Sequence, residues 1–95
     1  MVDVLNPDAL HHELDRLHGW EGTAKDGISK SFEFADFAGS IAFVNRLAEH
    51  AEQVGHHPDL AISWDTVTVT YITHSAGGVT QADIAQAREV DGLAV

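Results

Sequence analysis

The stretch that most constrains the fold of this sequence is the end of a helix at a glycine, followed directly by two histidines and a proline. In residues 52–58, EQVGHHP, Pro58 has a fixed φ and no backbone N–H, and it forces the preceding residue into extended geometry. His57 therefore cannot be helical, and the chain must turn here. Because imidazole titrates close to neutral pH, His56 and His57 on this rigid corner are well placed to transfer protons.

The helix that leads to this corner is the longest element that the sequence predicts. Asp36 can cap its start, and apolar side chains recur at spacings of three and four until Gly55 ends it. Phe43 falls off this stripe, and small residues would allow another helix to approach closely. A contact between protomers and burial against a sheet explain the pattern equally well. The stripe is Phe37, Ile41, Val44, Leu47 or Ala48, Ala51 and Val54, and the small residues are Ala38, Ala42 and Ala51.

A shorter helix is predicted near the N-terminus. Asn6 can cap it, Pro7 fits its first turn, and leucines at helical spacing mark its apolar face. Gly19 would end it, so we expect a helix over residues 7–18. The leucines are Leu10, Leu14 and Leu17.

Two hairpins are expected, one on each side of the long helix. In the first, residues 20–24 and 28–34 flank an Asp-Gly turn at Asp26. In the second, residues 60–62 and 66–71 alternate apolar and polar side chains around a turn at Trp64 and Asp65, and the hairpin ends at Thr73 and His74. The alternating apolar side chains are Ile28, Phe32, Phe34, Leu60, Ile62, Val67, Val69 and Tyr71.

The last predicted helix follows a loop over residues 75–78. Thr80 and Asp83 have the spacing of a capping box, and Ile84, Ala87 and Val90 continue the helical pattern. The element order is then αββαββα. This order predicts one α+β domain over residues 1–95, with two layers: a four-stranded antiparallel sheet and helices packed on one face.

Composition excludes several classes of function. Fifteen acidic residues against five basic ones give a net charge of −10, which disfavours direct binding to nucleic acid or to anionic membranes. The absence of cysteine excludes disulfides and thiolate sites. Residues 1–10 lack a basic region before an apolar one, and no segment approaches the ~20 apolar residues of a membrane span, so a cytoplasmic location is expected.

A third histidine can join the corner. His74 follows the fourth strand, so it would lie near the start of the third strand if the two pair antiparallel, and three imidazoles would then share one end of the sheet. The alternative is that these are unrelated histidines at the surface. Three histidines also suit zinc, but no HxH, HxxxH or HExxH spacing accompanies them, and no Gly-x-Ser-x-Gly motif indicates a serine hydrolase.

The combined pattern resembles a known family. The residues that carry it are Glu52, His56, His57, Pro58, Trp64, His74 and Asp83, supported by Gly19, Trp20, Phe32, Phe34, Asp36, Phe37, Ala51, Thr73, Gly78, Val79 and Thr80. This pattern, which covers almost the whole chain, resembles that of the pterin-4a-carbinolamine dehydratases, also called 4a-hydroxytetrahydrobiopterin dehydratases. The resemblance implies the αββαββα fold, a homodimer or homotetramer, and a reaction without metal or organic cofactor.

The family's reaction removes water from the 4a-carbinolamine that aromatic amino acid hydroxylases leave, gives quinonoid dihydropterin, and supports tetrahydrobiopterin recycling. By this resemblance, His56 and His74 would transfer protons, and His57 would position the substrate or assist. Asp83 would orient an imidazole as well as cap its helix. Glu52 matches the pattern too. It lies one turn before the histidines and could orient one of them, but an exposed helix acid is the favoured explanation. The expected substrate-binding residues are His57, Thr73 and Ser75.

The sequence also departs from the family pattern. Many relatives have Asp where this chain has Gly55, and Arg where it has Ala82, which bears on substrate affinity more than on the chemistry. Trp64 is expected to pack in its hairpin rather than to stack on a pterin. The other histidines, His11, His12, His18 and His50, match no catalytic position and are expected at the surface.

A rival function belongs to a different class. Some members of this fold act as dimerisation cofactors of transcription factors or as assembly factors. Such a protein-interaction module would not need His56, His57 and His74 together. The intact histidines therefore favour the enzyme.

Overall fold

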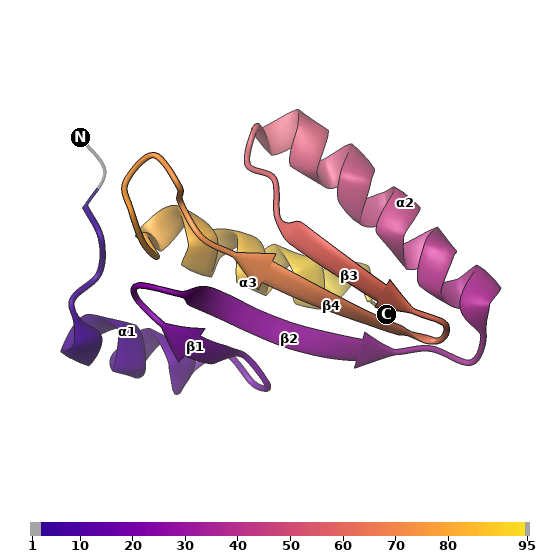
Figure 1. The fold of residues 1–95 in the computed structure, drawn as a ribbon, viewed down its shortest axis with the longest axis horizontal. Coiled ribbons are helices and arrows are strands. Elements are labelled where there is room, and N and C mark those ends of the chain that lie inside the picture. Colours follow the sequence, from indigo (N-terminus) through magenta and orange to yellow (C-terminus); the bar gives the residue numbers. More distant parts are fainter. Residues whose placement is uncertain (1–2, 95) are drawn as a thin grey trace.

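The computed structural model describes residues 3–94 as a four-stranded sheet accompanied by three helices (Figure 1). The predicted α+β class and the order αββαββα are confirmed, and the strand ends lie within about one residue of their expected positions. The elements are α1 (Pro7–Leu14), β1 (Glu21–Thr23), β2 (Gly27–Glu33), α2 (Phe37–Val54), β3 (Asp59–Ser63), β4 (Thr66–Tyr71) and α3 (Gln81–Leu93).

The sheet is antiparallel throughout, and its strand order is β1-β2-β4-β3. β4 is therefore an interior strand, and β3 lies at an edge. Asp59, at the start of β3, pairs with Thr70 near the end of β4. This register brings the connection after α2 and the segment after β4 to the same end of the sheet, which is the end where the histidines lie.

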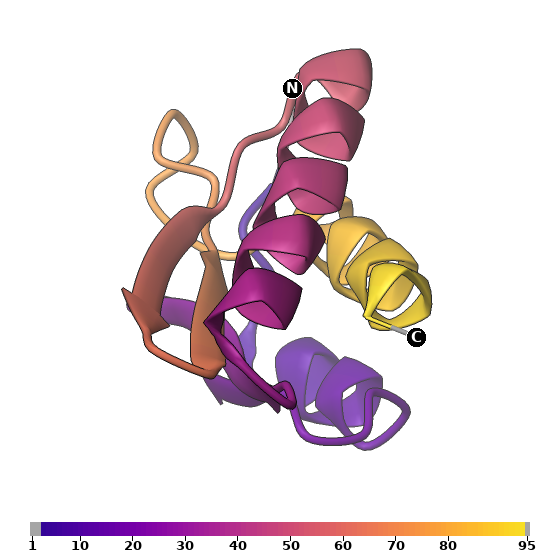
Figure 2. The same ribbon diagram turned by 90° about the vertical axis from the view of Figure 1, so that its right-hand side faces the viewer.

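The helices cover one face of the sheet, as Figure 2 shows by viewing the molecule along its length. On β4 the side chains of Val67, Val69 and Tyr71 are fully buried on the helix side. Threonines alternate with them on the other face, where the Thr68 hydroxyl lies 2.8 Å from that of Ser31 on β2. The alternation that predicted this strand is thus the alternation of a sheet covered on one side.

Aromatic side chains form the centre of the core. The ring centroids of Trp20 and Phe32 lie 6.2 Å apart, and those of Phe32 and Phe43 lie 5.1 Å apart. Tyr71 joins the cluster at 6.2 Å from Trp20. Such pairs contribute roughly 0.5–1.5 kcal/mol each beyond the burial of their area.

One carboxylate ties the last helix to the first hairpin. Oδ1 of Asp91 on α3 accepts hydrogen bonds from Nζ of Lys30 at 2.9 Å and from Nε1 of Trp20 at 3.1 Å. The same ammonium group donates to the backbone oxygen of His18 at 2.9 Å. Asp91 has a structural role far along α3 from the histidine end.

The apolar stripe predicted for α2 is confirmed in its middle and wrong elsewhere. Leu47 and Ala51 from the stripe are buried, but Phe43, expected off it, is also fully buried, whereas Phe37 and Val54, at the two ends of the helix, are 53% and 44% exposed. The buried face is therefore rotated from the predicted stripe toward Phe43, whose ring centroid lies 5.1 Å from those of Phe32 and Phe34.

The first helix is shorter than expected, because it ends at Leu14 rather than at residue 18. After this point the N–H groups of Arg16 and Leu17 bond to carbonyls three residues back instead of four. This tighter turn still buries Leu17 in the core. In the described residues, none of the three helices combines the length and the apolar character that crossing a membrane requires.

Candidate active site

The site begins where α2 ends. Gly55 adopts a left-handed conformation with φ 70°, and its N–H donates to the carbonyl of Ala51 at 2.9 Å. A side chain would meet no atom within 4 Å at this position, so its backbone conformation, and not a lack of space, favours glycine. The chain then leaves the helix sharply and presents His56 and His57 before Pro58 leads into β3.

His56 is bound by a buried carboxylate. Its Nε2 lies 2.6 Å from Oδ1 of Asp83, the third residue of α3. The Asp83 side chain is 0% exposed and that of His56 is 21% exposed. The start of α3 and the corner after α2 are thus joined directly, although the two residues are 27 positions apart in the sequence.

The second oxygen of Asp83 is bound from its own helix end and from β4. Oδ2 accepts from the backbone N–H of Thr80 at 2.9 Å and from the hydroxyl of Thr73 at 2.8 Å, and the two threonine hydroxyls lie 2.9 Å apart. Asp83 therefore caps the start of α3 with one carboxylate oxygen and holds His56 with the other. A carboxylate accepts hydrogen bonds only, so Nε2 of His56 donates to it, and Nδ1 is left as the nitrogen that can exchange a proton.

A tyrosine ring lies against His56. The imidazole stacks on Tyr71 with ring centroids 5.7 Å apart and an angle of 8° between the planes. Burial raises the pKa of the Tyr71 phenol to about 12, and the charge of Asp83 adds to the effect. The phenol therefore stays neutral at physiological pH and adds no charge to the site.

The other two histidines each lie near a carboxylate side chain of the protein, and both pairs are exposed to solvent. Nε2 of His57 contacts Oε2 of Glu52 one turn earlier, with the side chains 60% and 76% exposed. Nε2 of His74 lies 3.8 Å from Oδ2 of Asp59, with 77% and 70% exposed. Solvent screens both pairs, so they hold their imidazoles much less firmly than Asp83 holds His56.

Most of the residues expected at the site lie at this end of the molecule. His56, His57 and His74 follow α2 and β4, and each faces its own carboxylate. The Thr73 hydroxyl is turned to Asp83, while Ser75 is exposed in the next turn. Ala82 is exposed directly before Asp83.

Sequence reasoning missed three residues. Asp59 opposite His74 was detectable in principle, because it follows Pro58 and starts the strand that pairs with β4. Tyr71 matched a core pattern and carried no signal of a contact with His56. Thr80 was recognised only as a helix cap.

The prediction that Trp64 packs in its hairpin is wrong. It lies in the turn between β3 and β4 with φ 53°, and it is 69% exposed instead of packed. A two-residue turn between antiparallel strands requires such backbone angles, and these turn the side chain out of the core. The five residues of β3 separate Trp64 from the histidine end.

A shallow hollow adjoins the exposed histidine. It has a volume of about 200 Å³ and lies between α2 and the start of β3, with His57 and Glu52 among its lining residues. Its other lining residues are Leu47, Ala48, Ala51, Pro58 and Leu60. The volume is below the roughly 300–1,000 Å³ of most small-molecule pockets, so this hollow alone is too small to enclose a typical small-molecule ligand.

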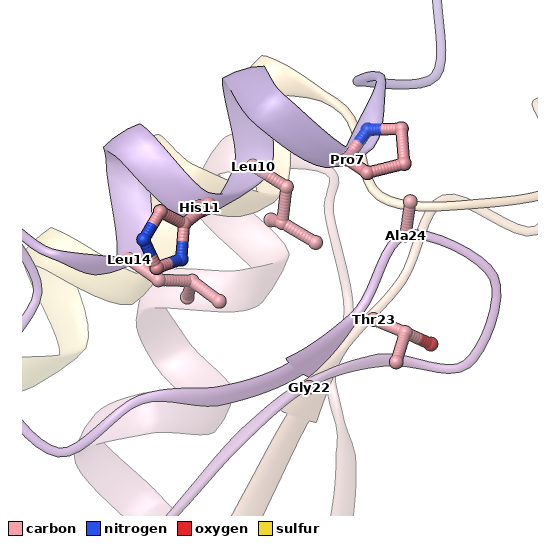
Figure 3. Close-up of a pocket in the computed structure, with 7 residues that line it drawn as sticks. All are labelled: Pro7, Leu10, His11, Leu14, Gly22, Thr23 and Ala24. Atoms are coloured by element: carbon pink, nitrogen blue, oxygen red, sulfur yellow. The ribbon is translucent and has the colours of Figure 1, made fainter.

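A larger hollow of about 350 Å³ lies between α1 and β1, away from these histidines (Figure 3). No acidic side chain lines it, and His11 is its only ionisable lining residue. His11 lies 3.6 Å from Asp15, but both of these side chains are exposed, whereas the carboxylate that holds His56 is buried. The end of the sheet with His56 is therefore the stronger candidate site in spite of its smaller hollow. Within residues 3–94, no three His, Asp or Glu side chains are arranged to hold a metal ion.

The fold and the site together define a class: a two-layer α+β domain in which a buried aspartate holds a partly exposed histidine, an arrangement that is suited to general acid–base chemistry. Residues 3–93 match the family described as Pterin 4 alpha carbinolamine dehydratase. The chain belongs to this family.

Relatives of full length support this assignment. The chain is 50% identical over 95 residues to a "Putative pterin-4-alpha-carbinolamine dehydratase" of Thermosynechococcus vestitus, which covers 100% of this chain and 99% of that protein. A protein of the same name from Mycolicibacterium vanbaalenii is 43% identical over 90 residues, covering 95% of this chain and 96% of the other.

Solved structures show the same fold. One, described as a transcriptional coactivator/pterin dehydratase from Brucella melitensis, aligns with a TM-score of 0.91 at 34% identity and covers 98% of this chain and 100% of its own. Another, described as a pterin dehydratase-like protein that is a RuBisCO assembly factor in the alpha-carboxysome, aligns with a TM-score of 0.69 at 30% identity over 81% and 90% of the two chains.

Proposed function

We propose that this protein is a dehydratase that converts a 4a-hydroxytetrahydropterin into a quinonoid dihydropterin and water. The observation that carries this proposal is the contact of His56 with the buried carboxylate of Asp83, which holds one imidazole by its Nε2 at the end of the sheet. Membership of the dehydratase family supplies the substrate class.

The reaction needs one base and one acid. A base takes the proton from N5, the C4a–O bond breaks, the C4a=N5 double bond forms, and an acid gives a proton to the departing hydroxyl. We assign the two proton transfers to His56 and His74, and substrate positioning to His57. Each well-placed group of this kind contributes about 10²–10⁴-fold to the rate.

The proposal is tested by substituting the histidines one at a time. Formation of quinonoid dihydropterin from chemically generated 4a-hydroxytetrahydropterin is followed for the wild type, His56→Ala and His74→Ala. We expect the rate to fall at least ~10²-fold in each variant. His12→Ala, an exposed histidine on α1, is the matched control and should keep the wild-type rate. Equal rates for all four proteins would overturn the assignment.

A second candidate function is protein binding without catalysis. It is favoured by the exposed apolar side chains of α2 and β3, Phe37, Val54, Leu60 and Ile62, and by the assembly factor among the related structures. A binding module would not depend on the His56–Asp83 pair. A folded wild-type protein that gives no acceleration would therefore favour this second candidate.

We further propose that a second copy of the chain covers this apolar face, in a homodimer or larger homo-oligomer. β3 is an edge strand whose five residues are all exposed, and its free backbone groups can pair with the same strand of another copy. Leu60 and Ile62 are 38% and 43% exposed on this strand. The hollow next to His57 adjoins the same face, so a second copy would also border the site.

A further inference from the structure

We propose that Tyr71 is a positioning residue: its ring fixes the plane of the His56 imidazole, while Asp83 fixes which nitrogen of that imidazole carries the proton. The catalytic consequence rests on the proposed function, but the positioning itself does not. The first observation is the stack between the two rings, 5.7 Å between centroids and 8° from parallel.

A single hydrogen bond does not hold a ring in place. The contact from Nε2 to Asp83 fixes one atom of the imidazole, and the ring could still pivot about that bond. A parallel ring against its face removes this freedom, because a pivot would separate the two planes. The two contacts together therefore define both the position and the plane of His56.

Tyr71 is itself firmly held. It is the last residue of β4, it pairs with Ile28 on β2, and it is 0% exposed. On the core side its ring lies 6.2 Å from that of Trp20. A side chain that is packed in this way is a rigid support, unlike the solvent-exposed partners of His57 and His74.

The ring also suits both charge states of the histidine. A neutral imidazole stacks on an aromatic face, and a charged imidazolium within about 6 Å of a ring centroid is attracted to the electrons of that face. An acid–base group changes its charge in each cycle. Tyr71 can therefore keep His56 in place before and after a proton is transferred.

The hydroxyl is not needed for this role. It has no hydrogen-bond partner among the side chains and backbone of residues 3–94, and the high pKa of the phenol, raised by burial and by Asp83, keeps it protonated. The ring should therefore be sufficient, and phenylalanine should replace tyrosine at this position. A role confined to filling the core would leave the state of His56 unaffected.

The experiment measures His56 directly. The ¹⁵N signals of its two ring nitrogens report which one is protonated, and turnover of 4a-hydroxytetrahydropterin gives kcat and KM. In the wild type we expect Nε2 to be protonated and Nδ1 not. In Tyr71→Leu we expect the two nitrogen signals to move toward each other and kcat to fall on the order of tenfold, with KM changed less than about threefold. Tyr71→Phe should restore the wild-type signals and most of the lost kcat.

A matched control removes an aromatic ring of the core elsewhere. Phe43 is also fully buried, but it contacts Phe32 and Phe34 and not His56. Phe43→Leu should lower stability and leave kcat and the His56 signals at their wild-type values. If Phe43→Leu disturbs them as much as Tyr71→Leu does, the effect is general loosening, and the inference is wrong.

The remaining outcomes separate this inference from the proposed function. A folded Tyr71→Leu protein with wild-type signals and kcat would overturn the inference and leave the dehydratase intact. An inactive wild type with the expected signals and the expected effect of Tyr71→Leu would overturn the dehydratase and leave the inference intact. If Tyr71→Leu does not fold, Tyr71→Met takes its place with the same expected signals and the same loss of kcat. A tenfold loss of kcat in Tyr71→Phe would assign the role to the hydroxyl and overturn the inference.

Discussion

Asp83 binds His56 from a fully buried position, with Oδ1 of the carboxylate 2.6 Å from Nε2 of the imidazole. The same carboxylate accepts the backbone N–H of Thr80 at the start of α3. Helix capping and histidine orientation are therefore functions of one side chain. A substitution at Asp83 changes both, and a control is needed to separate them.

Asp83→Asn should lower kcat on the order of 10²-fold. An amide has one acceptor atom and a donor NH₂ group, so it cannot accept from His56, Thr73 and Thr80 as the carboxylate does. Steady-state turnover checks this. The control is Asp91→Asn on the same helix, which keeps an oxygen that can accept from Lys30 and Trp20 but removes the negative charge opposite Lys30; it should cost about 1 kcal/mol of stability or less and leave kcat unchanged. Equal kcat for the two variants would contradict the role of Asp83.

The phenol of Tyr71 should make the protein less stable at high pH. Its pKa is about 12 in the folded protein and 10.0 without the effects of the fold. Below pH 10 both states are protonated and this group adds no pH dependence. Between pH 10 and 12 the unfolded chain loses the proton while the folded protein keeps it, so the free energy of unfolding falls, by about 2–3 kcal/mol.

Urea unfolding at increasing pH measures this effect. Tyr71→Phe is the control. It lacks the phenol but keeps every other titratable group, so it should lose correspondingly less stability between pH 10 and 12. If the two proteins lose stability in parallel between pH 10 and 12, the phenol is not the source of the effect.

The orientation of α2 makes a prediction about two phenylalanines. Phe43→Ala should lower the free energy of unfolding by about 3–5 kcal/mol, because it opens a cavity between Phe32 and Phe34. Phe37→Ala, at a position that is 53% exposed, should cost less than about 1 kcal/mol. Urea denaturation at low protein concentration measures both. The reverse order of the two effects would contradict the burial of Phe43 and the exposure of Phe37.

A charge on the exposed edge strand should prevent self-association. Ile62 is 43% exposed on β3, and Ile62→Lys would place an ammonium group in the face that we assign to a second copy. We expect sedimentation velocity to give an oligomer for the wild type and a monomer for this variant. Ser31→Lys adds the same charge to the helix-free face of the sheet and should keep the oligomer. A wild type that sediments as a monomer would refute the proposed association.

Local rules were sufficient for the elements and for part of the site. Gly55 and Pro58 mark the corner because glycine readily adopts the left-handed conformation that ends a helix and proline restricts its own backbone, and Thr80 and Asp83 mark the start of α3 because a capping box spans only four residues. The alternation along β4 likewise follows from burial on one side of the sheet. These signals depend on neighbours in the sequence, so the sequence alone could reveal them.

The rest depended on contacts between distant residues. The apolar stripe of α2 is broad, and the positions of Phe32 and Phe34 decide that Phe43 is part of its buried side. The pairing of Asp59 with His74 follows from the register of β3 and β4. The stack of Tyr71 on His56 looked like ordinary core spacing, because a buried aromatic in a strand has the same pattern whether it supports a catalytic group or only fills space.

The most direct test of the whole account is the rate at which 4a-hydroxytetrahydropterin loses water with wild-type protein, with His56→Gln, and without protein. We predict clear acceleration by the wild type and a rate at least ~10²-fold lower for a folded His56→Gln variant. A folded wild-type protein that leaves the reaction at its uncatalysed rate would contradict the dehydratase, and equal acceleration by both proteins would contradict the role of His56.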